Sequence, residues 1–203
     1  MHIETASVDS LILYFEEHIC EEVLDKVQHA YHALKKLPHI INLTPSYHSI
    51  LIEYDIYTHD TASLTRVIEE AIDSEPSLDA HRQGKLIEIP VDYSKGLDIE
   101  RIAQLHSLTP AEVIAKHTAQ TYRVYAVGFM VGFAYLAKVD DAIATARLST
   151  PRAKVPKGSV AIAETQTAVY PEESAGGWNI IGHTEFDNYT SFEIGDRVRF
   201  IAL

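Results

Sequence analysis

The sequence of 203 residues has one cysteine, one tryptophan and few basic residues, with 17 lysines and arginines against 29 aspartates and glutamates. A single cysteine excludes an intramolecular disulfide and a zinc site built from paired cysteines. The formal net charge of −12 argues against nucleic acid as the main partner, because binding to phosphates requires clustered lysine and arginine. The hydrophobic content of 46% is ordinary for a globular protein with a packed core.

Long apolar runs and several catalytic motifs are also lacking. No stretch approaches the roughly 18 apolar residues of a membrane-spanning helix, and residues 1–17 lack the basic start and apolar run of a secretory signal. There is no G-x-x-x-x-G-K-[ST] phosphate loop, no G-x-S-x-G elbow and no HExxH metal motif. We therefore expect a cytoplasmic protein with no membrane partner, no readable metal site and no ATPase site of the phosphate-loop kind.

The first half of the chain alternates between strand-like and helical patterns. Apolar residues from Ile19 to Leu37 recur every three or four positions, which predicts an amphipathic helix that ends at Pro38. A second helical face runs from Leu64 to Ile72, and the polar segment Asp73–Gln83 is predicted to be a loop. Strand-like runs occupy residues 11–15, 39–43, 49–56 and 85–91. The order β-α-β-β-α-β is typical of a split βαβ, ferredoxin-like sandwich, so residues 1–91 are predicted to form an α+β domain.

The pattern changes after Val91. A short helix is expected over Asp98–Leu105, and residues 109–112 form a capping box that starts another. Short strand-like runs then follow at residues 122–127, 159–163, 178–181 and 197–202. Many short strands separated by turn residues favour a small closed β-barrel over residues 92–203. We place the domain boundary near Val91–Lys95 and expect limited proteolysis around Ser74–Gln83 or Tyr93–Leu97. Sharing of the strand 85–91 between the two domains stays open.

Residues 128–184 contain a series of short motifs in a fixed order. The first is the segment GFMVGFAYL at residues 128–136. It is followed by Pro151-Arg152, Val155-Pro156, Gly158-Ser159-Val160, Gln166-Thr167, Tyr170-Pro171, Ser174-Ala175-Gly176-Gly177-Trp178 and Ile180-Ile181-Gly182-His183-Thr184. This order resembles the family that includes the B component of bacterial 5-oxoprolinase, the first component of allophanate hydrolase and the sporulation-kinase inhibitor KipI. The phrase PSYHSILIEYD at residues 45–55 is similar to the same family, whose domain is of the carboxyltransferase subdomain C and D type.

The resemblance implies a cyclophilin-like barrel and a component of an ATP-dependent 5-oxoprolinase, which opens a lactam to glutamate, or of a related allophanate-hydrolase-like amidohydrolase. It also implies ATP, a lactam or ureide substrate, and partners that resemble the C and A components of the same complex. Val131 and Ala134 replace family prolines, and Ala146 replaces the proline before Arg147. These changes alter loop backbone, so the fold inference is more secure than the activity inference.

Two other functions stay open. One is a regulatory binding protein resembling KipI, which inhibits a sensor histidine kinase. The other is a stand-alone prolyl isomerase, which ranks last because a barrel resemblance brings no catalysis by itself.

Arg152 is the first candidate site residue. Its planar guanidinium can grip a carboxylate or a phosphate with two hydrogen bonds, and Pro151 stiffens the backbone in front of it. The resemblance places a family Pro-Arg at this position. Arg152 is therefore predicted to supply the main positive charge of a ligand or partner cleft in the stretch 151–183. The alternative is a structural arginine paired with an acid.

The other candidates are polar, aromatic and glycine positions around the same stretch. Gln166 and Thr167 can pair donor and acceptor groups with a lactam or ureide. The remaining candidates for a substrate or partner cleft are Tyr170, Gly176, Gly177, Trp178, His183, Phe129 and Tyr135. Each also has a structural interpretation, as a turn pair for Gln166 and Thr167, as barrel core for the aromatic residues, or as a hydrogen-bonded histidine. No catalytic residue is assigned.

Overall fold

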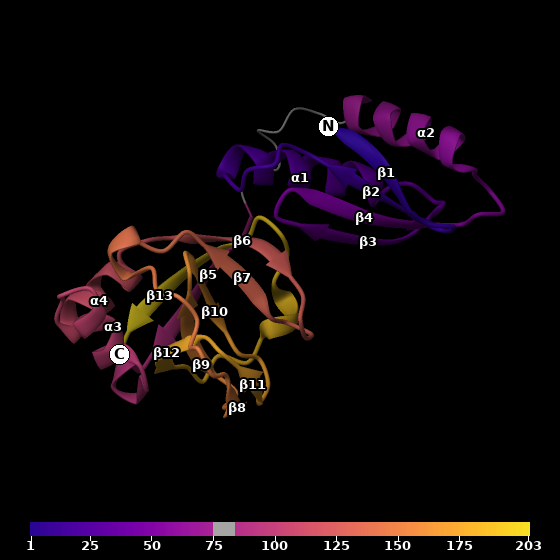
Figure 1. Ribbon diagram of the computed structural model, residues 1–203. Coiled ribbons are helices and arrows are strands. Elements are labelled where there is room, and N and C mark those ends of the chain that lie inside the picture. The colour runs from indigo at the N-terminus through magenta and orange to yellow at the C-terminus, as the bar shows by residue number, and fades with distance from the viewer. Residues whose placement is uncertain (75–83) are drawn as a thin grey trace. The chain divides into compact units, whose positions relative to one another are not determined.

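The computed structural model describes residues 1–74 and 84–203. The chain divides into two compact units, Met1–Gly84 and Lys85–Leu203, here called the N-terminal unit and the barrel unit (Figure 1). The predicted loop over Asp73–Gln83 lies outside the described residues except for its first two positions, which end helix α2.

The N-terminal unit is a four-stranded antiparallel sheet with two helices. Its elements are β1 (His2–Ser7), β2 (Ser10–Tyr14), α1 (Glu21–Leu34), β3 (Ile40–Ser46), β4 (Ser49–Tyr54) and α2 (Thr61–Ser74). The strand order is β1-β2-β4-β3, so β2, α1 and β3 form the predicted split βαβ unit with β4 between its strands. Alternate residues of β2 and β4 are fully buried, and α1 packs its apolar face against β3 and β4.

The prediction for the fourth strand of this sheet is wrong. Strand β5 (Leu86–Val91) pairs in parallel with β13 (Arg197–Ala202) in the barrel unit, where Ile89 and Val91 are fully buried in the core. The edge position beside β2 is taken instead by β1. The sequence of β1, HIETAS, has no alternating apolar pattern because five of its six residues are exposed. The units therefore divide at Gly84 and Lys85, and not near Val91.

The barrel unit is built on a seven-stranded sheet with the order β12-β9-β10-β7-β6-β13-β5. The strands after β5 are β6 (Tyr122–Val127), β7 (Ala134–Ala137), β8 (Arg152–Val155), β9 (Ser159–Ala163), β10 (Gln166–Val169), β11 (Ser174–Gly176), β12 (Asn179–His183) and β13. Asp92, directly after β5, exchanges two backbone hydrogen bonds of 2.8 and 3.0 Å with His183 at the end of β12. This bridge joins the two edge strands, so the prediction of a closed, cyclophilin-like barrel is confirmed.

Short helices and a two-stranded ribbon complete the barrel unit. The helical elements are η2 (Tyr93–Lys95), α3 (Ile99–Leu105), α4 (Pro110–Thr118), η3 (Asp141–Ile143) and η4 (Tyr189–Ser191). Helix α4 begins with the predicted capping box, in which Thr109 accepts from the Glu112 amide and the Glu112 carboxylate accepts from the Thr109 amide. Strands β8 and β11 form the ribbon, apart from the main sheet.

The barrel interior contains a buried polar chain centred on His117 of α4, which is 0% exposed. Thr167 donates its only hydroxyl proton to the carbonyl of Ala161 over 2.9 Å, so His117 Nε2 must donate to Thr167 Oγ1, 2.9 Å away. His117 Nδ1 then accepts from the Tyr93 hydroxyl at 2.7 Å. The imidazole is held neutral and lies 4.6 Å from the ring of Phe200.

This histidine is expected to make the barrel less stable in acid. Burial lowers the pKa of His117 from 6.5 to about 3. The unfolded chain therefore binds a proton as pH falls below 6.5, whereas the folded chain does not until about pH 3, so stability falls through this window. At about pH 5 the loss from this residue is about 2 kcal/mol.

Chemical denaturation of the wild type and of His117→Gln at neutral pH and at about pH 5 measures this contribution. The variant should lose less stability on acidification than the wild type does, although its free energy of unfolding is lower at neutral pH. Equal losses in His117→Gln and the wild type would contradict the assignment.

Candidate functional site

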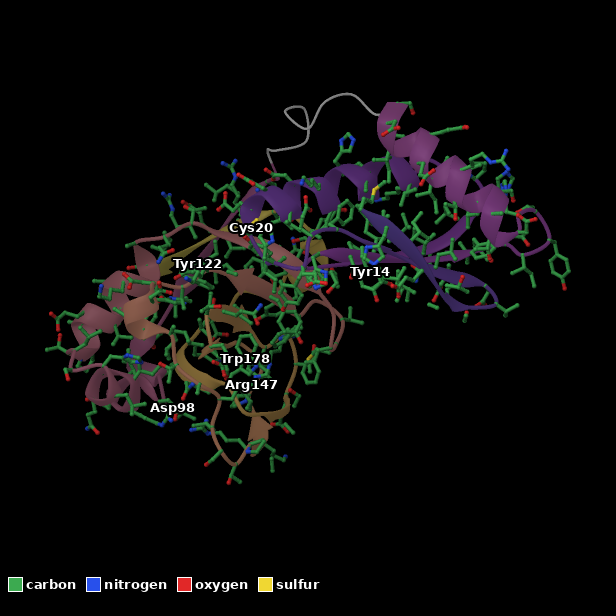
Figure 2. All side chains as sticks on the ribbon, turned by 45° about the horizontal axis from the view of Figure 1, so that its top comes forward. Tyr14, Cys20, Asp98, Tyr122, Arg147 and Trp178 are labelled. Carbon is green, nitrogen blue, oxygen red and sulfur yellow. The ribbon has the colours of Figure 1, made fainter. Side chains whose placement is uncertain are left out.

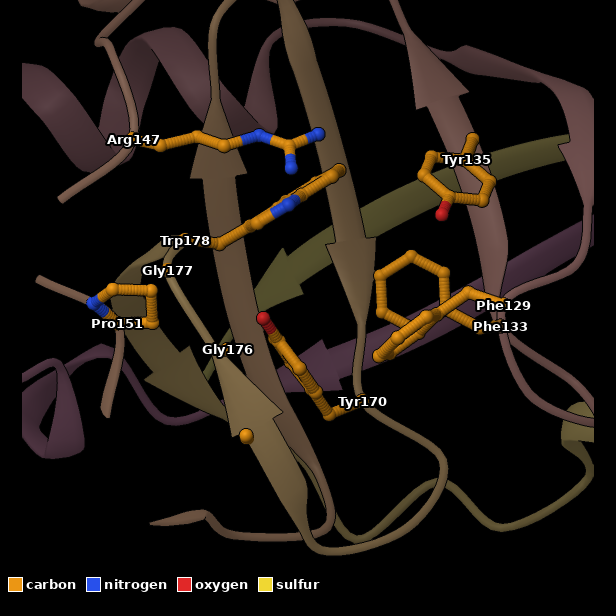
Figure 3. Close-up of a pocket in the computed structure, with 10 residues that line it drawn as sticks. Phe129, Phe133, Tyr135, Arg147, Pro151, Tyr170, Gly176, Gly177 and Trp178 are labelled. Carbon is orange, nitrogen blue, oxygen red and sulfur yellow. The ribbon is translucent and has the colours of Figure 1, made fainter. Parts of the chain in front are cut away.

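The barrel unit has a second apolar cluster. It lies on the outer face of β9 and β10, whereas the barrel core lies on their inner face. Strand β9 is buried on both faces, because Val160 and Ile162 point into the barrel core while Ala161 and Ala163 belong to the second cluster. The small alanines leave space above the sheet. A cavity of about 260 Å³ opens there, and we call it the aromatic cavity (Figure 3). It is lined by Phe129, Phe133, Tyr135, Arg147, Pro151, Tyr170, Ala175, Gly176, Gly177 and Trp178.

Phe133 is the centre of the aromatic wall. Its ring centroid lies 4.9 Å from that of Tyr135, 5.3 Å from that of Tyr170 and 5.7 Å from that of Trp178, each at a steep angle. Edge-to-face contacts of this kind stabilise one arrangement of the rings. Phe129 adds a fifth ring at the rim, 5.5 Å from Phe133. The cavity thus has rigid, preformed walls.

Arg147 brings the positive charge to this cavity. Its guanidinium lies 5.7 Å from the centre of the Trp178 ring, and Figures 2 and 3 show the two side chains together. Among residues 1–74 and 84–203, Arg147 makes no ion pair with a carboxylate. A guanidinium held over an indole face is attracted by the ring's electron density, and its N–H groups stay available to an anion.

Two tyrosine hydroxyls add polar groups to the apolar walls. Burial raises the pKa of Tyr135 and of Tyr170, and the nearby charge of Arg147 opposes this rise at both. A hydrogen bond from the backbone of Trp178 also lowers the pKa of Tyr170. Both hydroxyls remain protonated near neutral pH and can donate to a ligand carbonyl or accept from its N–H. The cavity therefore offers one cation, two hydroxyls and flat apolar faces.

Gly176 is required by the position of Tyr170. A Cβ atom at residue 176 would overlap the Tyr170 hydroxyl, whereas a Cβ atom at Gly177 meets nothing closer than 3.7 Å. Tyr170 is 1% exposed and packs edge-to-face against Phe133, so moving its ring would break this contact. Glycine at position 176 therefore fixes the distance between the ribbon and the cavity wall.

We expect Gly176→Ala to lower the free energy of unfolding by about 1–3 kcal/mol, because Tyr170 must leave its packed position. Gly177→Ala is the matched control, and it should leave stability unchanged or raise it slightly, since alanine restricts the unfolded chain more than glycine does. Thermal melting of both variants measures the difference. Equal melting temperatures would show that Tyr170 moves without cost.

Six of the ten residues predicted for a cleft line the aromatic cavity. They are Phe129, Tyr135, Tyr170, Gly176, Gly177 and Trp178. The sequence motifs that contain them are separated by up to about fifty residues, and the closed barrel brings them to one face. The other four predicted residues, Arg152, Gln166, Thr167 and His183, do not line it.

Arg152 is a correction to the prediction. Its Nη2 atom lies 2.7 Å from Oδ1 of Asp98, whose side chain is only 7% exposed, and Oδ2 of the same carboxylate accepts from the Ile180 amide at 2.7 Å. The carboxylate neutralises this arginine and ties the start of α3 to β12. Arg152 is therefore the structural arginine of the alternative interpretation, and Arg147 supplies the charge at the cavity.

The other three residues outside the cavity have local roles. Thr167 belongs to the buried chain around His117. His183 closes the barrel through its backbone, and its Nε2 lies 3.1 Å from the carbonyl oxygen of Lys157. Gln166 is half-buried at the start of β10 and pairs through its backbone with β7 and β9. A barrel strand points successive side chains to opposite faces, so Gln166 and Thr167 cannot both face one ligand.

Four cavity residues are not among the ten predicted for the cleft, namely Phe133, Arg147, Pro151 and Ala175. Arg147 stands where the first Pro-Arg of the family resemblance is expected, and the change of its proline to Ala146 weakens that signal. Phe133 is 2% exposed, which agrees with an ordinary core residue. The sequence leaves Phe133 open as part of an aromatic wall with Phe129 and Tyr135 or as barrel core, and the structure places it in the second apolar cluster.

None of the described α-helix starts fits an ATP phosphate group. Phosphates are commonly bound at a helix N-terminus that is free of acidic groups. Here each of the four α-helices has a carboxylate in or before its first turn, from Glu21 in α1, Asp60 before α2, Asp98 before α3 and Glu112 in α4. In residues 1–74 and 84–203 there is also no group of three or more potential metal ligands.

Over the same residues, no helix combines the length and apolar character needed to cross a membrane.

Comparisons with known proteins agree with this fold. The chain is 34% identical over 222 residues to the B component of 5-oxoprolinase from Bacillus subtilis, covering 99% of this chain and 92% of that one. It is 43% identical over 129 residues to the B component of 5-oxoprolinase from Haemophilus influenzae, covering 59% and 61% of the two chains. The crystal structure of TTHA0988 superposes with a TM-score of 0.83 at 32% identity over 96% of this chain.

The chain spans only 40% of TTHA0988, although it spans nearly the whole of the Bacillus relative. The model of one family, described as "Carboxyltransferase domain, subdomain C and D", matches residues 1–193. The chain therefore belongs to the carboxyltransferase-domain family of the subdomain C and D type, together with the B component of 5-oxoprolinase.

Proposed function

We propose that this protein is a component of an ATP-dependent 5-oxoprolinase, or of a related lactam or ureide amidohydrolase, and that its aromatic cavity binds the substrate. Two relatives of 34% and 43% identity, both named as the B component of 5-oxoprolinase, support the reaction class. Their name also supports assembly with further chains, which we propose to be proteins resembling the C and A components.

The observation that supports this function most is the guanidinium of Arg147 above an aromatic cavity in a strongly acidic chain, with no carboxylate partner among the residues that the structure describes. 5-Oxoproline is a small ring with one carboxylate and one lactam amide. Its ring carbons match the aromatic walls, its carboxylate matches the planar fork of Arg147, and its amide matches the hydroxyls of Tyr135 and Tyr170. The net charge of −12 opposes the approach of an anionic substrate, and a local cation offsets this repulsion.

In this proposal the chain binds and orients the lactam, and ATP is held by a partner protein. The carboxylates at all four described α-helix starts disfavour a phosphate site on this chain. ATP supplies activation of the lactam by phosphorylation. The cavity residues hold the substrate with its carboxylate on Arg147, and the apolar rings exclude water from the bound ring.

We expect the isolated chain to hydrolyse no 5-oxoproline in the presence of ATP, because it has neither a phosphate loop nor a recognisable nucleophile and base. Mixing it with its partner proteins should give ATP-dependent release of glutamate. The measurement is glutamate formation by each protein alone and by the mixture. Turnover by the isolated chain, or none by the mixture, would contradict this division of roles.

A second candidate function is a regulator resembling KipI. It is favoured by the loop between β6 and β7, where Phe129 is 66% exposed and Val131 is 80% exposed. Phe129 also has a φ of 72°, which is uncommon for a bulky residue and marks a local constraint. Exposed apolar side chains of this kind suit a protein partner. Inhibition of a sensor kinase that is unaffected by 5-oxoproline would favour this function over the enzyme component.

A further inference from the structure

The backbone around Arg147 lies alongside the start of β12. Residues 146–148 run beside residues 177–179, with one contact for each pair. The Leu148 amide donates to the Gly177 carbonyl over 2.7 Å, the Arg147 guanidinium lies 5.7 Å from the Trp178 ring, and Asn179 Nδ2 donates to the Ala146 carbonyl over 3.0 Å. The position of Arg147 is therefore fixed by the residues on both of its sides.

Asn179 is the side chain on which one of these contacts depends. It is 0% exposed, and its Nδ2 also donates to the Ile162 carbonyl over 3.1 Å. Its Oδ1 accepts from the Arg101 guanidinium of α3. Arginine can only donate and backbone carbonyls can only accept, so these three partners determine which way the amide faces.

We propose that Arg101, acting through Asn179, is a positioning residue for Arg147. The guanidinium of Arg101 holds the Asn179 oxygen toward α3, and the Asn179 nitrogen is thereby directed to the Ala146 carbonyl. Loss of Arg101 leaves the buried Asn179 oxygen without its charged donor, while the two carbonyls still hold the nitrogen side of the amide. The Asn179 side chain then shifts to find another donor for its oxygen, the hydrogen bond to the Ala146 carbonyl weakens, and the guanidinium of Arg147 is held less firmly over Trp178.

Arg101 lies on the exposed surface of α3, outside the residues that line the aromatic cavity. Among the described residues it makes no ion pair that would give it another structural task. A merely structural arginine here would affect melting only. A positioning residue must also change the environment of Trp178 and the affinity at Arg147.

The test uses the full chain without ligand, because Trp178 is the only tryptophan and its emission reports the guanidinium above it. The variants are Arg101→Met, Arg147→Met, the double variant and the conservative Arg101→Lys. Arg199→Met is the matched control, since it removes an equal charge from the same unit, where Arg199 pairs with the exposed Glu88 on β5.

We expect Arg101→Met to change Trp178 emission in the same direction as Arg147→Met, and the double variant to add nothing to Arg147→Met. Arg101→Lys should give an emission spectrum close to that of the wild type, and Arg199→Met should give the wild-type spectrum. The proposal is overturned if Arg101→Met keeps wild-type emission while Arg147→Met does not. It is equally overturned if the two changes simply add, or if Arg147→Met leaves the emission unaltered.

The second readout rests on the proposed function. In the reconstituted enzyme, Arg101→Met should raise the KM for 5-oxoproline on the order of fivefold, the scale of one lost hydrogen bond, with kcat nearly unchanged. The two failures are distinguishable. If Arg147→Met and Arg101→Met both leave KM unchanged, the proposed substrate site is wrong, whereas an effect of Arg147→Met alone contradicts only the role of Arg101.

Discussion

Replacing Arg152 by methionine is expected to lower the free energy of unfolding by about 2–3 kcal/mol, because the buried Asp98 carboxylate is left with an unpaired charge. Breaking a fully buried pair costs more, but the Arg152 side chain is 28% exposed and water screens part of the charge. Asp98 keeps its bond from the Ile180 amide, which limits the loss. Chemical denaturation of the variant measures the effect.

The control is Lys154→Met, since Lys154 follows two residues later on β8 and pairs with Glu173 while 77% exposed. Exposed pairs of this kind contribute at most about 1 kcal/mol. A loss of stability in Lys154→Met as large as that in Arg152→Met would remove the special role of the Asp98 pair. A stable Arg152→Met variant with impaired substrate binding would return Arg152 to the ligand site.

The opposite result is expected for Arg147. In the reconstituted enzyme, Arg147→Met should raise the KM for 5-oxoproline by about tenfold or more, which corresponds to a lost charge-assisted hydrogen bond of about 1.5–3 kcal/mol. Thermal stability should change little, because Arg147 is exposed and has no described carboxylate partner.

Arg147→Lys separates charge from geometry. Lysine keeps the cation but lacks the planar fork and stacks less well on an indole, so an intermediate KM is expected. If Arg147→Met leaves KM unchanged in an active complex, the substrate binds without this guanidinium and the aromatic cavity is not its site.

Much of the fold follows from the sequence, because amphipathic helices and alternating strands leave a strong pattern. Helix α1, the capping box of α4 and the predicted strands of the barrel lie close to their expected positions. The strands β1, β7, β8, β10 and β11 are not among the predicted ones. Strand β5 is predicted in the wrong sheet, because its apolar residues are compatible with either sheet. Its partner is β13, more than a hundred residues later, and no local pattern reports such a pairing.

The two arginines show why the site could be predicted only in part. The order of the motifs indicates which stretch forms the cavity, and six of the ten predicted residues line that cavity. Whether an arginine is neutralised depends on which carboxylate the fold places beside it. Asp98 is 54 residues before Arg152 in the chain, so only the folded barrel shows that Arg152 is paired and that Arg147 has no carboxylate partner in residues 1–74 and 84–203.

His117 illustrates a second limit. Its sequence position on α4 gives no sign of the Tyr93 and Thr167 hydroxyls that surround it. Thr167 is a ligand candidate from the sequence because it follows Gln166 in a family motif. Thr167 alternates with Gln166 along β10, so its side chain points into the barrel, where a hydroxyl must find a buried partner.

Direct binding of 5-oxoproline to the purified chain tests the central claim most plainly, with the emission of Trp178 as the signal. We predict a saturable change in emission for the wild type and for Arg199→Met, and a binding curve shifted by about tenfold or more for Arg147→Met. The lactam ring that lacks the carboxylate of 5-oxoproline should bind to the wild type as weakly as 5-oxoproline binds to Arg147→Met. Equal binding of 5-oxoproline by the wild type and Arg147→Met, or saturation that does not alter Trp178 emission, would contradict the assignment of the aromatic cavity as the substrate site.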